Sequence, residues 1–86
     1  MPTKSRREVI QSHVIRLLRE ERRRQDISIT TLAMRAGLSQ PMVSYVEREM
    51  RKPTLDTLLR IAEALDIDLD SVIRQARKAA STPKSA

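Results

Sequence analysis

Four polar side chains that lie close together in the chain have the types and spacing needed to form hydrogen bonds with a second molecule. Gln40, Ser44 and Tyr45 carry amide or hydroxyl groups, and Arg48 carries a guanidinium. With about 3.6 residues per turn, these positions share one side of an α-helix with Pro41. Groups of this kind donate and accept hydrogen bonds, so they indicate recognition. A helix that shows them to solvent is suited to contacting the edges of base pairs.

The stretch that must position these side chains is SITTLAMRAGLSQPMVSYVER, which predicts two short helices joined by a tight turn. Gly37, the only glycine in the chain, marks the turn, because glycine readily adopts the left-handed conformation. Ser28 and Ser39 are predicted N-caps, since a serine oxygen accepts from a free N–H of the first turn. Pro41 fits the first turn of the second helix, where its missing N–H has no intrahelical partner. The inward residues at helical spacing are Leu32, Ala33, Ala36, Val43 and Val46.

Three more helices are predicted, one before this pair and two after it. The first runs from Arg7 to about Gln25, because apolar residues recur there at three- and four-residue spacing. Its arginines are interpreted as a solvated face with a share of phosphate contacts: Arg16, Arg19, Arg22, Arg23 and Arg24. Thr54 caps the next helix, whose apolar residues are assigned to the core: Leu55, Leu58, Leu59, Ile61, Ala62 and Leu65. Asp68 is predicted to cap the last helix.

The segments outside the helices are mostly basic. Residues 1–7 are polar and predict a flexible arm that carries Lys4, Arg6 and Arg7 and either reaches into a groove or contacts nothing. Pro53 breaks the helical pattern and predicts a loop after the second helix of the pair. The loop brings Arg51 and Lys52 beside Arg48, where they are placed for contacts with phosphates. Residues 79–86 predict a disordered tail, which leaves residues 8–78 as the folded domain.

Composition narrows the class of protein. A chain of 86 residues forms one small domain, and its net charge of +6 and pI of about 10.8 favour a polyanionic partner. A membrane-surface helix is disfavoured, because the first helix lacks tryptophan and phenylalanine and its apolar stripe is needed for the core. No apolar run has the length of a membrane span, and the start MPTKSRRE lacks the apolar middle of a secretory signal.

The sequence also lacks the usual residues of catalytic and metal sites. It contains no cysteine and one histidine, which excludes thiolate and zinc sites, and no cofactor is predicted. There is neither a serine–histidine–aspartate set nor a glycine-rich phosphate loop. The protein is therefore expected not to be an enzyme, and the absence of cysteine fits a cytoplasmic protein.

These motifs, taken in order, resemble the lambda-repressor and Cro-like DNA-binding domains, the family also called XRE-type regulators. The runs that carry the resemblance are GLSQ, VSYVER and RKPTLDTLLRIAEAL, and the likeness covers roughly residues 14–72. It implies an all-α fold: a compact five-helix domain with a helix-turn-helix formed by the second and third helices. It also implies binding to double-stranded DNA and regulation of transcription.

The resemblance assigns roles to individual residues. Its base-contacting positions match Gln40, Pro41, Ser44 and Tyr45. Arg22 and Glu47 match an ion pair that ties the first helix to the third, and the region where such domains often form dimers matches Leu69, Val72 and Ile73. The expected phosphate contacts are Ser39, Arg48, Arg51, Lys52, Lys4, Arg6 and Arg7.

Two residues depart from the family pattern. Ile29 stands where many members have a glutamine that anchors a phosphate, so that contact is not expected here. Glu49 stands where a glycine usually ends the third helix in a left-handed turn. A glutamate there either adopts that strained conformation, at a cost of order 1 kcal/mol, or lets the helix run on. Its charge also lies near the expected DNA.

The functional prediction is a homodimeric, sequence-specific regulator, a repressor that occludes a promoter. In a homodimer the third helices of the two copies are related by a two-fold axis. This symmetry implies a palindromic operator, with half-sites about one helical turn, roughly 34 Å, apart. The alternative is an antitoxin or other protein-interaction module with the same fold. This alternative stays open because fold alone does not decide function. The partner would then be a protein, such as a toxin or a polymerase.

Overall fold

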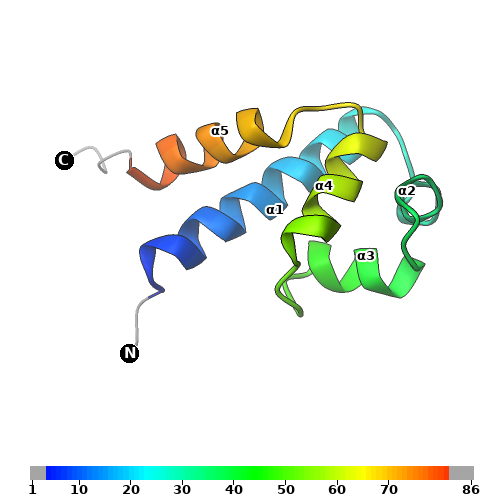
Figure 1. The fold of residues 1–86 in the computed structure, drawn as a ribbon, viewed down its shortest axis with the longest axis horizontal. Coiled ribbons are helices and arrows are strands. Elements are labelled where there is room, and N and C mark those ends of the chain that lie inside the picture. The colour runs from blue at the N-terminus through cyan, green and yellow to red at the C-terminus, as the bar shows by residue number, and fades with distance from the viewer. Residues whose placement is uncertain (1–3, 82–86) are drawn as a thin grey trace.

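The computed structural model describes residues 4–81, which form five α-helices. Their bounds are α1 (Arg6–Arg24), α2 (Ile29–Ala36), α3 (Gln40–Glu47), α4 (Leu55–Ala64) and α5 (Leu69–Ser81). α1 and α5 pack against each other with opposite chain directions, and α2, α3 and α4 gather at one end of that pair (Figure 1). The predicted all-α domain of five helices is confirmed, with α2 and α3 forming the helix-turn-helix.

Hydroxyl side chains cap the first turns of α1 to α4. The side-chain oxygens of Ser28, Ser39 and Thr54 accept from the backbone N–H three residues later, at 3.0, 3.2 and 3.1 Å. These three predicted caps are confirmed. Ser5 forms a fourth cap, accepting from the N–H of Glu8 at 3.3 Å, while the Glu8 carboxylate accepts from the Ser5 N–H at 3.0 Å. This reciprocal pair is a capping box.

Both ends of the fold extend beyond the boundaries predicted from the sequence. Arg6 and Arg7 lie in the first turn of α1, so their assignment to a flexible arm is wrong. Lys4 precedes the cap, and its Nζ donates to Ser12 Oγ at 3.1 Å. At the other end α5 continues to Ser81, so residues 79–81 belong to a helix and not to a tail. The rest of the predicted arm and tail, residues 1–3 and 82–86, lies outside the described residues.

Four helices end in the same kind of left-handed turn. A residue with positive φ follows each of them: Asp26 (58°), Gly37 (69°), Glu49 (56°) and Asp66 (57°). In each turn the next residue donates its N–H to the carbonyl five residues earlier, which is the Schellman motif. The residues that donate these bonds are all apolar: Ile27, Leu38, Met50 and Ile67. Met50 is exposed, and the other three are buried or half-buried.

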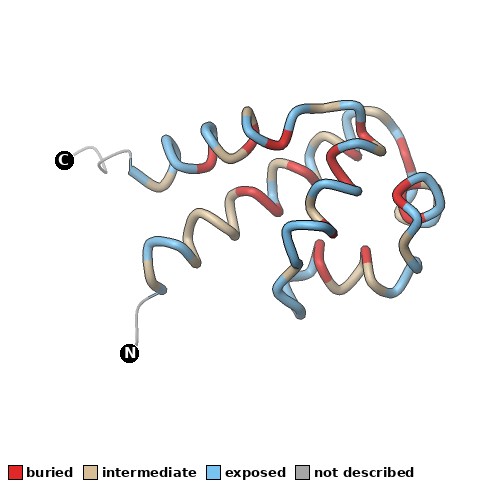
Figure 2. The backbone as a smooth tube through the Cα atoms, in the orientation of Figure 1, coloured by how far each residue is buried: buried red, intermediate tan, exposed pale blue. Residues whose placement is uncertain are grey.

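The core fills the space between α1, α2, α4 and the inner sides of α3 and α5 (Figure 2). All five inward residues predicted for the helix-turn-helix are buried, at 5% exposure or less. On α4 the core assignment is wrong for Leu55 and Leu59, which are 63% and 44% exposed. The buried stripe of α4 runs through Thr57 and Ile61. Leu55 and Leu59 each precede one of these by two residues, a rotation of about 200° around the helix.

Replacing Asp66 by glycine is expected to raise the free energy of unfolding by about 0.5–1 kcal/mol. A non-glycine residue in the left-handed conformation costs about 1–2 kcal/mol, which the greater freedom of glycine in the unfolded chain partly offsets. Urea denaturation of both proteins measures the change. Asp66→Ala is the matched control, because it removes the same charge and keeps the backbone penalty. An equal gain from the two variants would assign the effect to charge.

Candidate nucleic-acid interface

The outward side of α3 carries the four predicted base-contacting residues. Gln40 and Pro41 are exposed in its first turn, and Ser44 and Tyr45 are half-buried one turn later. The inward side is apolar, since Val43 is fully buried. The structure therefore gathers the predicted reading residues on one face of a short helix whose other face is fixed in the core.

Cationic side chains extend this face beyond the end of α3. Arg48 is the C-cap residue and is exposed, as are Arg51 and Lys52 in the connection to α4. The guanidinium carbon of Arg51 lies 5.3 Å from the centroid of the Tyr45 ring, at cation–π distance. Sequence reasoning missed this contact, which holds Arg51 beside the reading face. Ser39 is exposed at the other end of α3, where its hydroxyl forms the cap.

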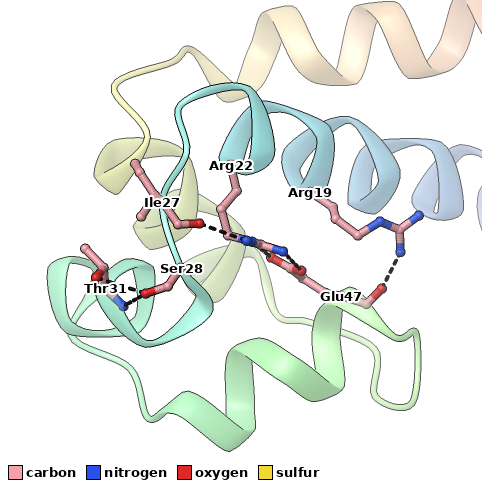
Figure 3. A network of polar contacts seen from close by, with 6 residues as sticks. All are labelled: Arg19, Arg22, Ile27, Ser28, Thr31 and Glu47. Atoms are coloured by element: carbon pink, nitrogen blue, oxygen red, sulfur yellow. Dashed lines mark hydrogen bonds and ion pairs between the residues drawn. The ribbon is translucent and has the colours of Figure 1, made fainter.

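A buried polar network attaches the end of α3 to α1 (Figure 3). Arg22 and Glu47 form the ion pair that the family resemblance implies, with Nε and Nη2 donating to the two carboxylate oxygens at 2.6 and 2.9 Å. Arg22 Nη1 also donates to the carbonyl of Ile27 at 2.8 Å. Arg19 Nη1 donates to the backbone carbonyl of Glu47 at 2.7 Å. Together these bonds, here called the α1–α3 clamp, fix the C-terminal end of the reading helix.

The α1–α3 clamp corrects the interpretation of the arginine run as a solvated face. Arg22 is buried at 9% exposure and Arg19 is half-buried. Arg16, Arg23 and Arg24 are exposed, as predicted. The missed signal is the spacing, because residues 19 and 22 share one side of a helix with the apolar residues Ile15 and Leu18.

Glu49 ends α3 by adopting the left-handed conformation with φ of 56°. Its Oε1 accepts a hydrogen bond from Ser12 Oγ of α1 at 2.7 Å, and Ser12 in turn accepts from Lys4. The carboxylate is therefore tied to α1. Nearby, hydrogen bonds from Ser5 lower the pKa of Glu8, and the positive charge of Lys52 lowers it further.

The residues predicted for a dimer interface divide into two groups. Leu69 and Val72 are 7% and 6% exposed within the single chain, so their assignment to an interface is corrected. They pack into the core between α5 and its neighbours. Ile73 is half-buried and lines a groove between α4 and α5 together with Leu59 and Ile67. Leu69 also lines this groove, together with the acidic residues Glu63, Asp68 and Asp70, so α5 leaves open a surface of mixed apolar and acidic character.

Within residues 4–81, no group of three or more histidine, aspartate or glutamate side chains is arranged to hold a metal ion. None of the five helices there combines the length and apolar character needed to cross a bilayer.

A family model described as helix-turn-helix (HTH_3) matches residues 18–72. The match covers well over half of the chain, including all of α2, α3 and α4, so the chain belongs to the helix-turn-helix family of the XRE, or Cro/C1, type. Members of this family bind DNA and are not enzymes, which confirms the prediction that the chain is not an enzyme.

Curated relatives carry similar sequences. The uncharacterized HTH-type transcriptional regulator Rv0474 of Mycobacterium tuberculosis is 42% identical over 53 residues, which cover 62% of this chain and 38% of that protein. The uncharacterized HTH-type transcriptional regulator y4dL of Sinorhizobium fredii is 37% identical over 57 residues, covering 66% of this chain and 29% of that protein. The chain thus matches well under half the length of these relatives.

A solved structure shows the same fold. The crystal structure of a mutant of the restriction–modification controller protein C.Esp1396I matches with a TM-score of 0.73 and 22% identity. The match covers 80% of this chain and 90% of that one. It supports the five-helix arrangement described above.

The substitution Arg22→Ala is expected to lower the free energy of unfolding by about 3–5 kcal/mol, because it leaves the Glu47 carboxylate buried without its counter-charge. Urea denaturation measures the loss. Arg24→Ala is the matched control on the same helix, since Arg24 pairs with Glu21 at the surface, where its side chain is 71% exposed. That change is expected to leave the free energy of unfolding nearly unchanged, because solvent screens an exposed ion pair. Equal losses would contradict a structural role for the α1–α3 clamp.

Proposed function

We propose that this chain is a transcriptional regulator that binds double-stranded DNA sequence-specifically and represses by occluding a promoter. The observation that carries the proposal is the face of α3, where Gln40, Ser44 and Tyr45 lie together with their helix fixed by the α1–α3 clamp. The relatives named as transcriptional regulators support it. Binding to DNA would place the protein in the cytoplasm of a bacterial cell.

In this proposal α3 enters the major groove. The amide of Gln40 is suited to a bidentate contact with adenine, and the hydroxyl of Ser44 bonds to either kind of base. Pro41 and Tyr45 supply apolar contact beside them. Arg48, Arg51 and Lys52 follow at the end of the helix and neutralise phosphates, as do Lys4 and Arg7 at the edges of the face. The Ser39 hydroxyl adds a neutral hydrogen bond to a phosphate. Contacts of this kind make binding fall steeply with salt concentration.

The regulator is proposed to act as a homodimer. Two copies related by a two-fold axis would place their α3 helices in half-sites about 34 Å apart on a palindromic operator. Leu59 and Ile73 are the apolar residues available for the contact between copies, since they line the open groove between α4 and α5. Of the three residues that the sequence analysis assigned to a dimer interface, this proposal keeps Ile73.

An antitoxin or another protein-interaction module is the second candidate function. The same open groove favours it, because an apolar surface between two helices also accommodates a helix of a different protein. A toxin or a polymerase subunit would then be the partner. The two functions differ in whether binding to DNA has a base preference.

Selection from a random duplex library is expected to yield a converged palindrome for the wild-type protein. Gln40→Ala should relax the preference at one base position in each half-site, at a cost of about 1–3 kcal/mol in discrimination. Arg51→Ala should weaken binding to all duplexes about equally and lower the salt slope by about 1. A wild-type selection without any consensus would refute base reading by α3 and favour the protein-interaction function.

The variants Leu59→Glu and Ile73→Glu are expected to convert the dimer to a monomer, because each puts a charge into an apolar contact without a partner. Sedimentation equilibrium gives the mass, and circular dichroism checks that the helices remain. Met50→Glu is the matched control, since Met50 is 58% exposed in the turn after α3 and does not line the groove. Dimers that persist in both groove variants would locate the interface elsewhere.

A further inference from the structure

A second concentration of positive charge lies at the end of the molecule opposite the helix-turn-helix. The start of α1 and the end of α5 meet there, while α2 and α3 lie at the other end (Figure 1). A shallow groove between the two helix ends is lined by four cations and one hydroxyl: Arg6, Arg74, Arg77, Lys78 and Ser81. We call this surface the polar-end groove. No carboxylate is among its lining residues.

The contacts of the three arginines leave much of their charge uncompensated. Arg6 donates from Nη2 to the neutral Ser81 Oγ at 2.6 Å. Arg74 lies 3.8 Å from the Asp70 carboxylate, with both side chains about three-quarters exposed, so solvent screens the pair. Arg77 forms no hydrogen bond or ion pair within residues 4–81 and is exposed.

The fold, and not the local sequence alone, assembles this charge. Arg74 and Arg77 are three residues apart on α5, a spacing at which side chains are neighbours and like charges repel. Arg6 joins them from the other end of the chain, and its bond to Ser81 holds it there. An anion in the groove would relieve this repulsion. Guanidinium groups favour phosphate in particular, because their planar donors match two phosphate oxygens at once.

We propose that the polar-end groove is a second DNA-binding surface, which contacts backbone phosphates outside the segment that α3 reads. The described molecule is 43 Å long, somewhat more than one turn of duplex DNA at roughly 34 Å. The phosphates therefore belong either to the flank of the same duplex or to a second duplex held at the other end. The inference goes beyond the proposed function, because it requires backbone contact but no base preference.

The test compares two full-length double variants that lose the same charge. Arg74→Gln/Arg77→Gln alters the polar-end groove, and Arg35→Gln/Arg60→Gln removes two exposed cations of α2 and α4 that are assigned no DNA contact. Fluorescence anisotropy measures the affinity for a 40-bp duplex (about four helical turns) of mixed sequence across a range of salt concentrations. The slope of log K against log salt is expected to fall by about 1.8 for the groove variant only, about 0.9 for each lost phosphate contact. Equal slopes for the two variants would overturn the proposal.

Two further measurements complete the design. Co-capture of a fluorescent duplex on a biotinylated one identifies a second duplex as the source, and a changed slope without co-capture identifies the flank of the same duplex. A groove variant that loses binding to poly-glutamate with an unchanged DNA slope would assign the groove to an acidic protein and overturn the proposal.

Library selection separates this result from the fate of the proposed function. The groove variant keeps α3 intact and is expected to select the same consensus as the wild type. A changed salt slope in a protein that selects no consensus would support the groove while refuting base reading. A normal consensus with an unchanged salt slope would support base reading by α3 and refute DNA binding by the polar-end groove.

Discussion

The buried ion pair between Arg22 and Glu47 is the constraint on which the reading face depends. α3 has eight residues and is too short to be stable on its own, so its orientation comes from its attachments. The Ile27 carbonyl accepts a third hydrogen bond from Arg22. No buried side-chain polar atom within residues 4–81 lacks a partner. Burying two charges adds little net stability even when they pair well. What the pair supplies is one defined position for the helix.

Both ends of α3 are fixed by local devices that act with this pair. Ser39 caps the start, and Glu49 ends the helix in a left-handed turn, a conformation that favours glycine. The carboxylate of Glu49 bonds to Ser12, so the strained residue also joins the turn to α1. The chain beyond the turn then brings Arg51 over the Tyr45 ring. The strained backbone at Glu49 thus lies just before Arg51, the cation at the proposed DNA surface.

The sequence was sufficient where structure follows from neighbouring residues. The caps at Ser28 and Ser39 and the turn at Gly37 depend on local bonds, and each was predicted correctly. Ser5 was missed although its partner Glu8 is three residues away, because the basic composition of residues 1–7 was taken as a flexible arm. The assignment of Leu59 to the core is wrong because its helix has apolar residues on more than one side, and their spacing does not identify the buried side.

Other features depend on contacts between distant segments, which the sequence does not display. The apolar residues of α5 predict burial but do not distinguish a core in the same chain from a contact with a second copy, and Leu69 was assigned to the wrong one. The contact between Tyr45 and Arg51 depends on the path of the loop after Glu49. That path requires Glu49 to adopt the left-handed conformation, which is unfavourable for a residue other than glycine. Family resemblance supplied the pair of Arg22 with Glu47, which spacing alone did not.

The bond between Arg6 and Ser81 joins residues that are 75 positions apart and brings the first and last described helices to one pole. A domain whose ends lie close together is topologically almost a closed ring, and such domains tolerate circular permutation. The break in the ring can be moved without disturbing the helix-turn-helix, which lies at the other pole (Figure 1). The point at which the chain is interrupted is therefore separable from the geometry that presents α3.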